Sequence, residues 1–290
     1  MSVSMELLAL PLAETILMGT LSGMVGALAV ISRRVFFAES ITHATFPGAV
    51  AGVVVVTAAG TALTGARIGY EILSIAVLIG AVLMCAPMTW LMRRLSELPG
   101  ISSQAAAGIV LSLGFALGHL LSTWFAPLPL KVDGFLTGSV LNVNHADVAL
   151  TVMVLTVTVV VVVAAGHHLE SYCFDAVAYR AVGLNPRLPE RTVLVLICLN
   201  IGVLIPAVGT ILPIALIAAP AAALRSRARS VSGLLIGSAA LGAGCCLAGL
   251  WLAVLLEWSA GGTIAVICGL VYAASRIRHV RFPGRRAGRS

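Results

Sequence analysis

Residues 147–166 read DVALTVMVLTVTVVVVVAAG, an apolar run with a single charged side chain, Asp147, at its start. A helix needs about 20 such residues to cross a hydrocarbon core about 30 Å thick. Similar runs recur along the chain, in which 60% of the residues are hydrophobic and 10% are charged. A typical soluble domain carries about 25% charged residues. The sequence therefore predicts an all-α, polytopic membrane protein that forms one domain over residues 1–290.

The apolar runs predict eight or nine transmembrane helices. We count nine runs, at 10–32, 36–58, 71–92, 104–126, 147–166, 192–206, 208–224, 231–256 and 261–275. The least certain part is 192–224, because Pro206 and Gly209 interrupt it and leave two short halves. These halves could form a tight hairpin, or one broken helix followed by a re-entrant segment.

The basic residues predict the orientation in the membrane. If all nine runs cross, 16 of the 18 basic residues lie on one side, and only Arg67 and Lys131 lie on the other. Basic residues concentrate in cytoplasmic loops. We therefore expect an outside N-terminus and a cytoplasmic C-terminus. The same rule accounts for the net charge of +7 without any binding of nucleic acid.

Glu39 and His43 are the most informative polar residues within the apolar runs. They stand four residues apart, so they share one face of a helix. Pro47 has no N–H to bond the carbonyl group of His43, so we expect a kink there and a freed carbonyl oxygen. A carboxylate with an imidazole suits Zn²⁺, Mn²⁺ or Fe²⁺. The alternative is a glutamate near the headgroups and a histidine that bonds a neighbouring helix.

A short amphipathic helix is predicted in the polar segment 172–186. Asp175 is a favoured N-cap for a helix from Ala176 to Val182, and Gly183 suits the left-handed position that follows a helix. Such a helix has no packing role inside the membrane, so it is either a docking element or a plain surface helix.

Two further patterns bear on assembly and chemistry. Gly233 and Gly237 have the GxxxG spacing that favours close helix contacts, either within the chain or in a dimer. The sequence holds no GxSxG, HExxH or Walker A motif, so we expect no catalytic activity and no resident cofactor. Energy from ATP would have to come from another chain.

Four stretches, in order, resemble the permease subunits of bacterial zinc, manganese and iron uptake ABC transporters. They are RR at 33–34 with FAESITHATFPG at 37–48, GIVLSLGFALG at 108–118, FDAVAYRAVGL at 174–184 and VGTILPIALIAAPAA at 208–222. The second part of the first stretch is similar to the family motif Gly-Asp-Ala-Leu-Ser-His-Ala-x-x-Pro-Gly. This chain has Ala38 and Glu39 where that motif has Gly and Asp.

The resemblance implies a permease in the plasma membrane of a bacterium, without permanently bound cofactors, that carries a divalent transition metal, Mn²⁺, Zn²⁺ or Fe²⁺. It implies a homodimer in membrane lipid, two cytoplasmic ATPase subunits and an extracytoplasmic metal-binding protein. The metal residues of the family correspond to Glu39 and His43. The coupling segment corresponds to 172–186, with Asp175, Ala178, Ala181 and Gly183 as the residues expected to act on the ATPase.

A secondary metal carrier that works without an ATPase is the main alternative. The predicted helix at Asp175–Gly183 argues against it, because such a carrier needs no docking helix.

Overall fold

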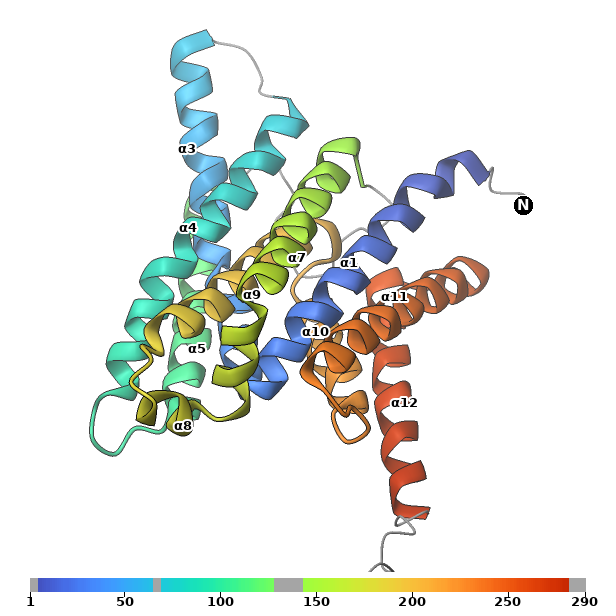
Figure 1. Ribbon diagram of the computed structural model, residues 1–290. Helices are drawn as coiled ribbons and strands as arrows, with labels where there is room; N and C mark the ends of the chain where they lie inside the picture. Colours follow the sequence, from blue (N-terminus) through green and yellow to red (C-terminus); the bar gives the residue numbers. More distant parts are fainter. Residues whose placement is uncertain (1–4, 65–68, 128–142, 282–290) are drawn as a thin grey trace, which may run out of the picture.

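The computed structural model describes residues 5–64, 69–127 and 143–281, most of which are helical (Figure 1). The prediction of an all-α, polytopic membrane protein is confirmed. The helices of the described part are α1 (Met5–Ile31), α2 (Val35–Ala44), α3 (Phe46–Thr64), α4 (Tyr70–Ser96), α5 (Ser103–Trp124), α7 (His145–Phe174), α8 (Ala176–Ala181), α9 (Arg187–Val208), α10 (Ile211–Leu224), α11 (Val231–Leu256) and α12 (Ala260–Arg281).

Eight segments of the described residues are long and apolar enough to span a membrane, and α2 and α3 together count as one of them. The remaining apolar run, 208–224, forms α10, which has 14 residues. It is about 21 Å long at 1.5 Å per residue, short of a hydrocarbon core about 30 Å thick. Gly209, at φ 77°, separates α10 from α9. Leu216 and Ile217 of α10 are fully buried, so this short helix is part of the interior of the bundle.

Several helices begin where the sequence provides a capping side chain. Ser102 accepts a hydrogen bond from the first turn of α5, and Ser230 does the same for α11. Asn144 and Asp147 form a capping box at the start of α7. These bonds satisfy N–H groups that the helices leave without an internal partner.

Helix α1 lies at the centre of the fold and packs most extensively against α11, with further contacts to α10, α7 and α9. Glycines allow the close approach of α1 to α11. A Cβ atom on Gly19 would lie 2.6 Å from the carbonyl oxygen of Gly242, and one on Gly23 would lie 2.1 Å from that of Ser238. The two backbones are therefore in direct contact, as is usual where small residues line helix interfaces in membranes.

Helices α3 and α4 pack against each other and project from one side of the bundle (Figure 1). Gly48 of α3 and Gly80 of α4 face each other there, and a Cβ atom on Gly80 would lie 2.1 Å from the carbonyl oxygen of Gly48. This contact lies within the α3–α4 pair, while α2 packs mainly against α5.

The α4–α5 connection, α8 and the α10–α11 connection lie at the same end of the molecule, and the N-terminus lies toward the opposite end (Figure 1). We call it the arginine-rich end, because two cavities next to α8 are lined there by Arg33, Arg34, Arg93, Arg180, Arg187, Arg191, Arg225 and Arg229. This gathering agrees with the charge pattern of the sequence. The orientation itself, and the positions of Arg67, Lys131 and the last arginines, lie outside what the described residues show.

Candidate functional site

Glu39 and His43 lie on α2, whose other face is fully buried. Helix α2 packs mainly against α5, with smaller contacts to α10, α9 and α4. Glu39 and His43 are only half-buried, while the residues between them, Ser40, Ile41 and Thr42, are buried. The predicted pair therefore shares one accessible face, as the spacing of four residues requires.

Close packing on α5 holds the opposite side of α2 in place. Ser40 donates a hydrogen bond through its hydroxyl group to the carbonyl oxygen of Ala107. A Cβ atom on Gly114 would lie 2.4 Å from the Cα atom of Ala44, so the helices touch backbone to backbone at that point. Small residues on α5 thus decide how deeply α2 sits in the bundle.

The ring of His43 is held against an aromatic ring and keeps one nitrogen unused. It packs edge-on against Phe115 of α5, with ring centroids 6.1 Å apart and planes at 78°. Its Nδ1 atom is buried and has no hydrogen-bond partner among the described residues. A buried polar atom usually has a partner, so the missing partner of this nitrogen marks it as a candidate for binding a ligand that the chain does not itself supply.

The spanning helix that begins with α2 is interrupted just beyond His43. Helix α2 ends at Ala44 and α3 begins at Phe46. Thr45 lies between them, and its N–H group donates to the carbonyl oxygen of Ile41 at 2.9 Å. The helix is thus interrupted at one residue, close to the kink expected at Pro47, while Thr45 keeps a helical conformation. Pro47 supplies no N–H group for the carbonyl oxygen of His43.

This arrangement places one carboxylate and one imidazole, both side chains of types that can bind a metal ion, on one helix face. The described residues contain no group of three or more His, Cys, Asp or Glu side chains that could hold a metal ion. Two protein ligands suit an ion that is bound only briefly, with water or a second chain completing its coordination.

The predicted short helix is present as α8, from Ala176 to Ala181, with Val182 as its C-cap residue. The carboxylate of Asp175 accepts hydrogen bonds from the N–H groups of Val177 at 2.9 Å and Ala178 at 3.0 Å. Gly183 follows at φ 82°. The cap and the left-handed glycine thus lie where the sequence predicted them.

One face of α8 is anchored and the other is exposed. Tyr179 is buried and packs edge-on against Tyr172 of α7, with ring centroids 6.0 Å apart. Ala178 and Ala181 are exposed, and Val177 and Val182 are more than three-quarters exposed. An apolar, solvent-facing helix surface of this kind is typical of a contact site.

A cavity of about 1230 Å³ adjoins α8. It lies between the ends of α1 and α7 and the start of α11, and Arg33, Arg225 and Arg229 line it. The exposed side of α8 is thus continuous with a hollow in the arginine-rich end.

Gly233 and Gly237 lie on the first turns of α11, outside the tightest helix contacts of the chain. Gly233 is exposed, and a Cβ atom there would lie 3.0 Å from the hydroxyl oxygen of Ser230. A Cβ atom on Gly237 would lie 3.1 Å from a methyl group of Leu224. The backbone-to-backbone contacts of α11 with α1 begin just beyond them, at Ser238 and Gly242.

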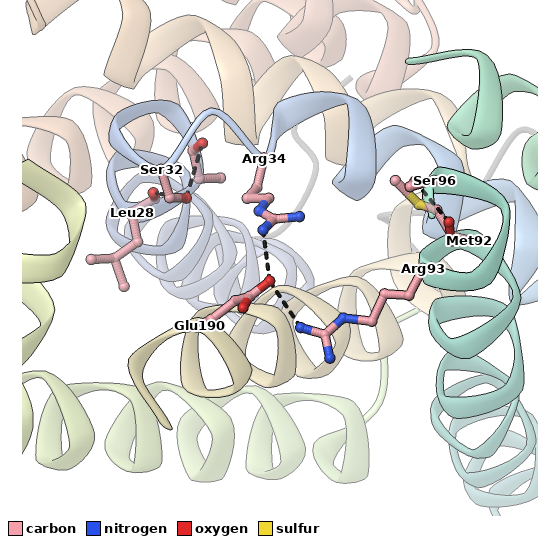
Figure 2. A network of polar contacts seen from close by, with 8 residues as sticks. Leu28, Ser32, Arg34, Met92, Arg93, Ser96 and Glu190 are labelled. Carbon is pink, nitrogen blue, oxygen red and sulfur yellow. Dashed lines mark hydrogen bonds and ion pairs between the residues drawn. The ribbon is translucent and has the colours of Figure 1, made fainter. Parts of the chain in front are cut away.

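Two acidic residues that sequence reasoning missed are also prominent. Figure 2 shows Glu190, at the start of α9, whose Oε1 atom accepts from Arg34 at 2.7 Å and from Arg93 at 2.8 Å. Glu14 on α1 is fully buried and accepts a hydrogen bond from Thr151 of α7 at 2.5 Å. The sequence does show both as acidic residues inside or beside an apolar run. It does not show their partners, because these are distant along the chain.

Comparison with known proteins identifies relatives over nearly the whole chain. Residues 4–279 match the family model described as the ABC 3 transport family. The zinc transport system membrane protein TroC of Treponema pallidum is 31% identical over 221 residues, which cover 75% of this chain and 70% of TroC. The manganese import system permease protein ScaB of Streptococcus gordonii is 26% identical, over 91% of this chain and 88% of ScaB.

A solved structure has the same fold. PsaBC from Streptococcus pneumoniae, solved in complex with Fab, superposes with a TM-score of 0.80 at 22% identity. The superposition covers 97% of this chain and 96% of the other.

Proposed function

This chain belongs to the ABC 3 transport family, and we propose on that basis that it is the membrane permease subunit of an ATP-driven importer of divalent transition-metal ions. Relatives named as zinc and manganese transport proteins support Zn²⁺ or Mn²⁺ as the cargo, with Fe²⁺ as a third candidate. Eight membrane-spanning segments in the described residues agree with a multi-pass protein, which we place in the plasma membrane of a bacterium.

The observation that carries the proposal is the unused Nδ1 atom of His43, one helical turn from Glu39 on the same half-buried face. An imidazole nitrogen and a carboxylate bind Zn²⁺, Mn²⁺ and Fe²⁺. Ionisable residues inside a spanning helix usually face a pathway or a cavity. We therefore assign Glu39 and His43 to the route that the ion takes.

The partners follow from the same family assignment. The chain would act as a homodimer with cytoplasmic ATPase subunits and would receive its ion from an extracytoplasmic binding protein. The exposed apolar side of α8 supports a docking role toward the ATPase, with Asp175 and Gly183 fixing the ends of the helix and Ala178 and Ala181 at the contact.

The test is uptake of labelled Mn²⁺, Zn²⁺ and Fe²⁺ by a bacterial strain that lacks its own importers and produces the complete transporter. His43→Ala should abolish uptake at normal membrane levels, because it removes one of the two side chains that we propose as ligands. His119→Ala is the matched control. It also removes a histidine from a spanning helix, next to the buried Gly118 of α5, but this histidine is not a proposed ligand. Full uptake by both His43→Ala and Glu39→Ala would refute the site.

A second variant separates the importer from a secondary carrier. Ala178→Glu places a charge on the exposed side of α8 and should stop uptake while the membrane fold stays intact. A carrier that works without an ATPase would keep its uptake in this variant, and also when the ATPase subunit is inactivated.

A further inference from the structure

Glu190 joins three helices at the arginine-rich end. Its Oε1 atom accepts from both Arg34, which immediately precedes α2, and Arg93, in the last turn of α4 (Figure 2). The side chain of Glu190 is 19% exposed, so the pairs are partly shielded from water. The side chains of Arg34 and Arg93 are 33% and 41% exposed, so solvent screens the arginine side of both pairs.

Arg34 stands at the start of the helix that carries Glu39 and His43. It is the N-cap residue of α2, and its N–H group donates to the carbonyl oxygen of Ala29 of α1 at 2.7 Å. Arg33 before it adopts φ 58°, a conformation that costs free energy for residues other than glycine. The turn between α1 and α2 is therefore tight, and a displacement of Arg34 would reach Glu39 through one and a half turns of helix.

The other side of this network reaches α8. Tyr179 of α8 packs against Tyr172 of α7 and lies 3.4 Å from Nδ1 of His168 through its hydroxyl oxygen. The charges of Glu190 and Arg34 lie near enough to Tyr172 to act on its hydroxyl group. A second route from α8 to Glu190 runs along the backbone, because α9 begins shortly after α8 and Glu190 lies in the first turn of α9. Both routes from α8 end at the Arg34–Glu190 pair.

The pair also has room to rearrange. A cavity of about 530 Å³ borders it and is lined by Arg34, Arg93 and Glu190, together with Arg180 and Arg187. A single carboxylate shared by two guanidinium groups can strengthen its bond to one while weakening that to the other. An element that switches between two such arrangements can carry coupling between distant sites.

We propose that Glu190 is a positioning residue that transmits movement of α8 to α2, and so sets the position of Glu39 and His43 when the ATPase acts. The inference rests on the proposed function, and it assigns to the ion pairs a role beyond holding the fold together. An ion pair that only stabilised the fold would influence the amount and the thermal stability of the protein, but not the ratio between ATP hydrolysis and transport.

The experiment measures metal transported per ATP hydrolysed, in the transporter assembled with its ATPase and binding-protein subunits in vesicles. Glu190→Gln keeps the size of the side chain and removes its charge. We expect ATP hydrolysis to continue, while metal per ATP falls about tenfold, within the usual range of coupling between sites. Glu190→Asp, which keeps the charge, should restore part of the ratio.

Glu97→Gln is the matched control, because Glu97 pairs with Arg94 at 3.7 Å on an exposed surface and should leave the ratio unchanged. Tyr172→Phe tests the route from α8 and should also lower the ratio, and its effect should not add to that of Glu190→Gln.

An unchanged ratio in Glu190→Gln would overturn the proposal, as would parallel losses of hydrolysis, transport and thermal stability. His43→Ala, measured alongside, separates this failure from failure of the proposed function, because normal uptake in that variant would refute the site itself.

Discussion

Glu39 and His43 place a carboxylate and an imidazole one turn apart on α2, so the length of the acidic side chain would decide where the two proposed ligands meet. In the metal-uptake permeases that the motif resembles, Asp stands at the position of Glu39. Glutamate reaches one methylene further from the same backbone. Because His43 is held against Phe115, the carboxylate is the ligand more free to adjust. The metal preference should therefore respond to this one residue.

We predict that Glu39→Asp keeps metal uptake but changes the relative uptake of Mn²⁺ and Zn²⁺, since the carboxylate withdraws from the imidazole. Competition between the two labelled ions in cells that produce each variant measures the change. Glu39→Gln, which keeps the length and removes the charge, should lose uptake of both ions. Equal uptake and equal preference in all three proteins would show that the carboxylate does not contact the ion.

Helix packing depends on a few glycines that allow backbone contact. On α11, Gly242 touches α1, and a Cβ atom there would lie 2.3 Å from the carbonyl oxygen of Gly19. Gly244, two residues on, would meet nothing within 4 Å among the described residues. The same helix thus offers one glycine that packing requires and one that it does not.

Gly242→Ala should destabilise the protein by about 1–3 kcal/mol, the usual cost of overpacking. Gly244→Ala should leave stability unchanged or raise it by up to about 1 kcal/mol, because alanine is the better helix former. Thermal unfolding of the purified variants in detergent compares the two. Equal midpoints would contradict the close α1–α11 contact.

For the molecule as a whole, eight arginines line the two cavities at the end that holds α8, so the positive-inside rule predicts that this end is cytoplasmic. Helix α11 connects that end to the opposite one. Arg227 lies before its start and Ser259 after its end, and both are exposed.

We predict that Arg227→Cys is labelled only from the cytoplasmic side of the membrane and Ser259→Cys only from the outside. The six native cysteines are buried, so they should give little background. Impermeant thiol reagents, applied to intact cells and to inverted vesicles, make the measurement. Labelling of both positions from one side would refute the topology.

The sequence predicted those features that depend on neighbours along the chain. The length of the hydrophobic runs located the spanning segments. Asp175 and Gly183 marked the ends of α8, because helix capping depends on residues only a few positions apart. The break between α2 and α3 followed from Pro47 for the same reason. The spacing of Glu39 and His43 placed them on one face without any knowledge of the other helices.

Tertiary structure alone decided which distant residues meet. Glu190 is 156 residues from Arg34 and Glu14 is 137 residues from Thr151, and no local pattern links the members of either pair. The short α10 is likewise accommodated only because other helices cover it. Hydrophobicity sets which segments enter the membrane, since the bilayer acts on each segment separately. The packing of one helix on another depends on the shapes of both, and so arises only when the whole bundle assembles.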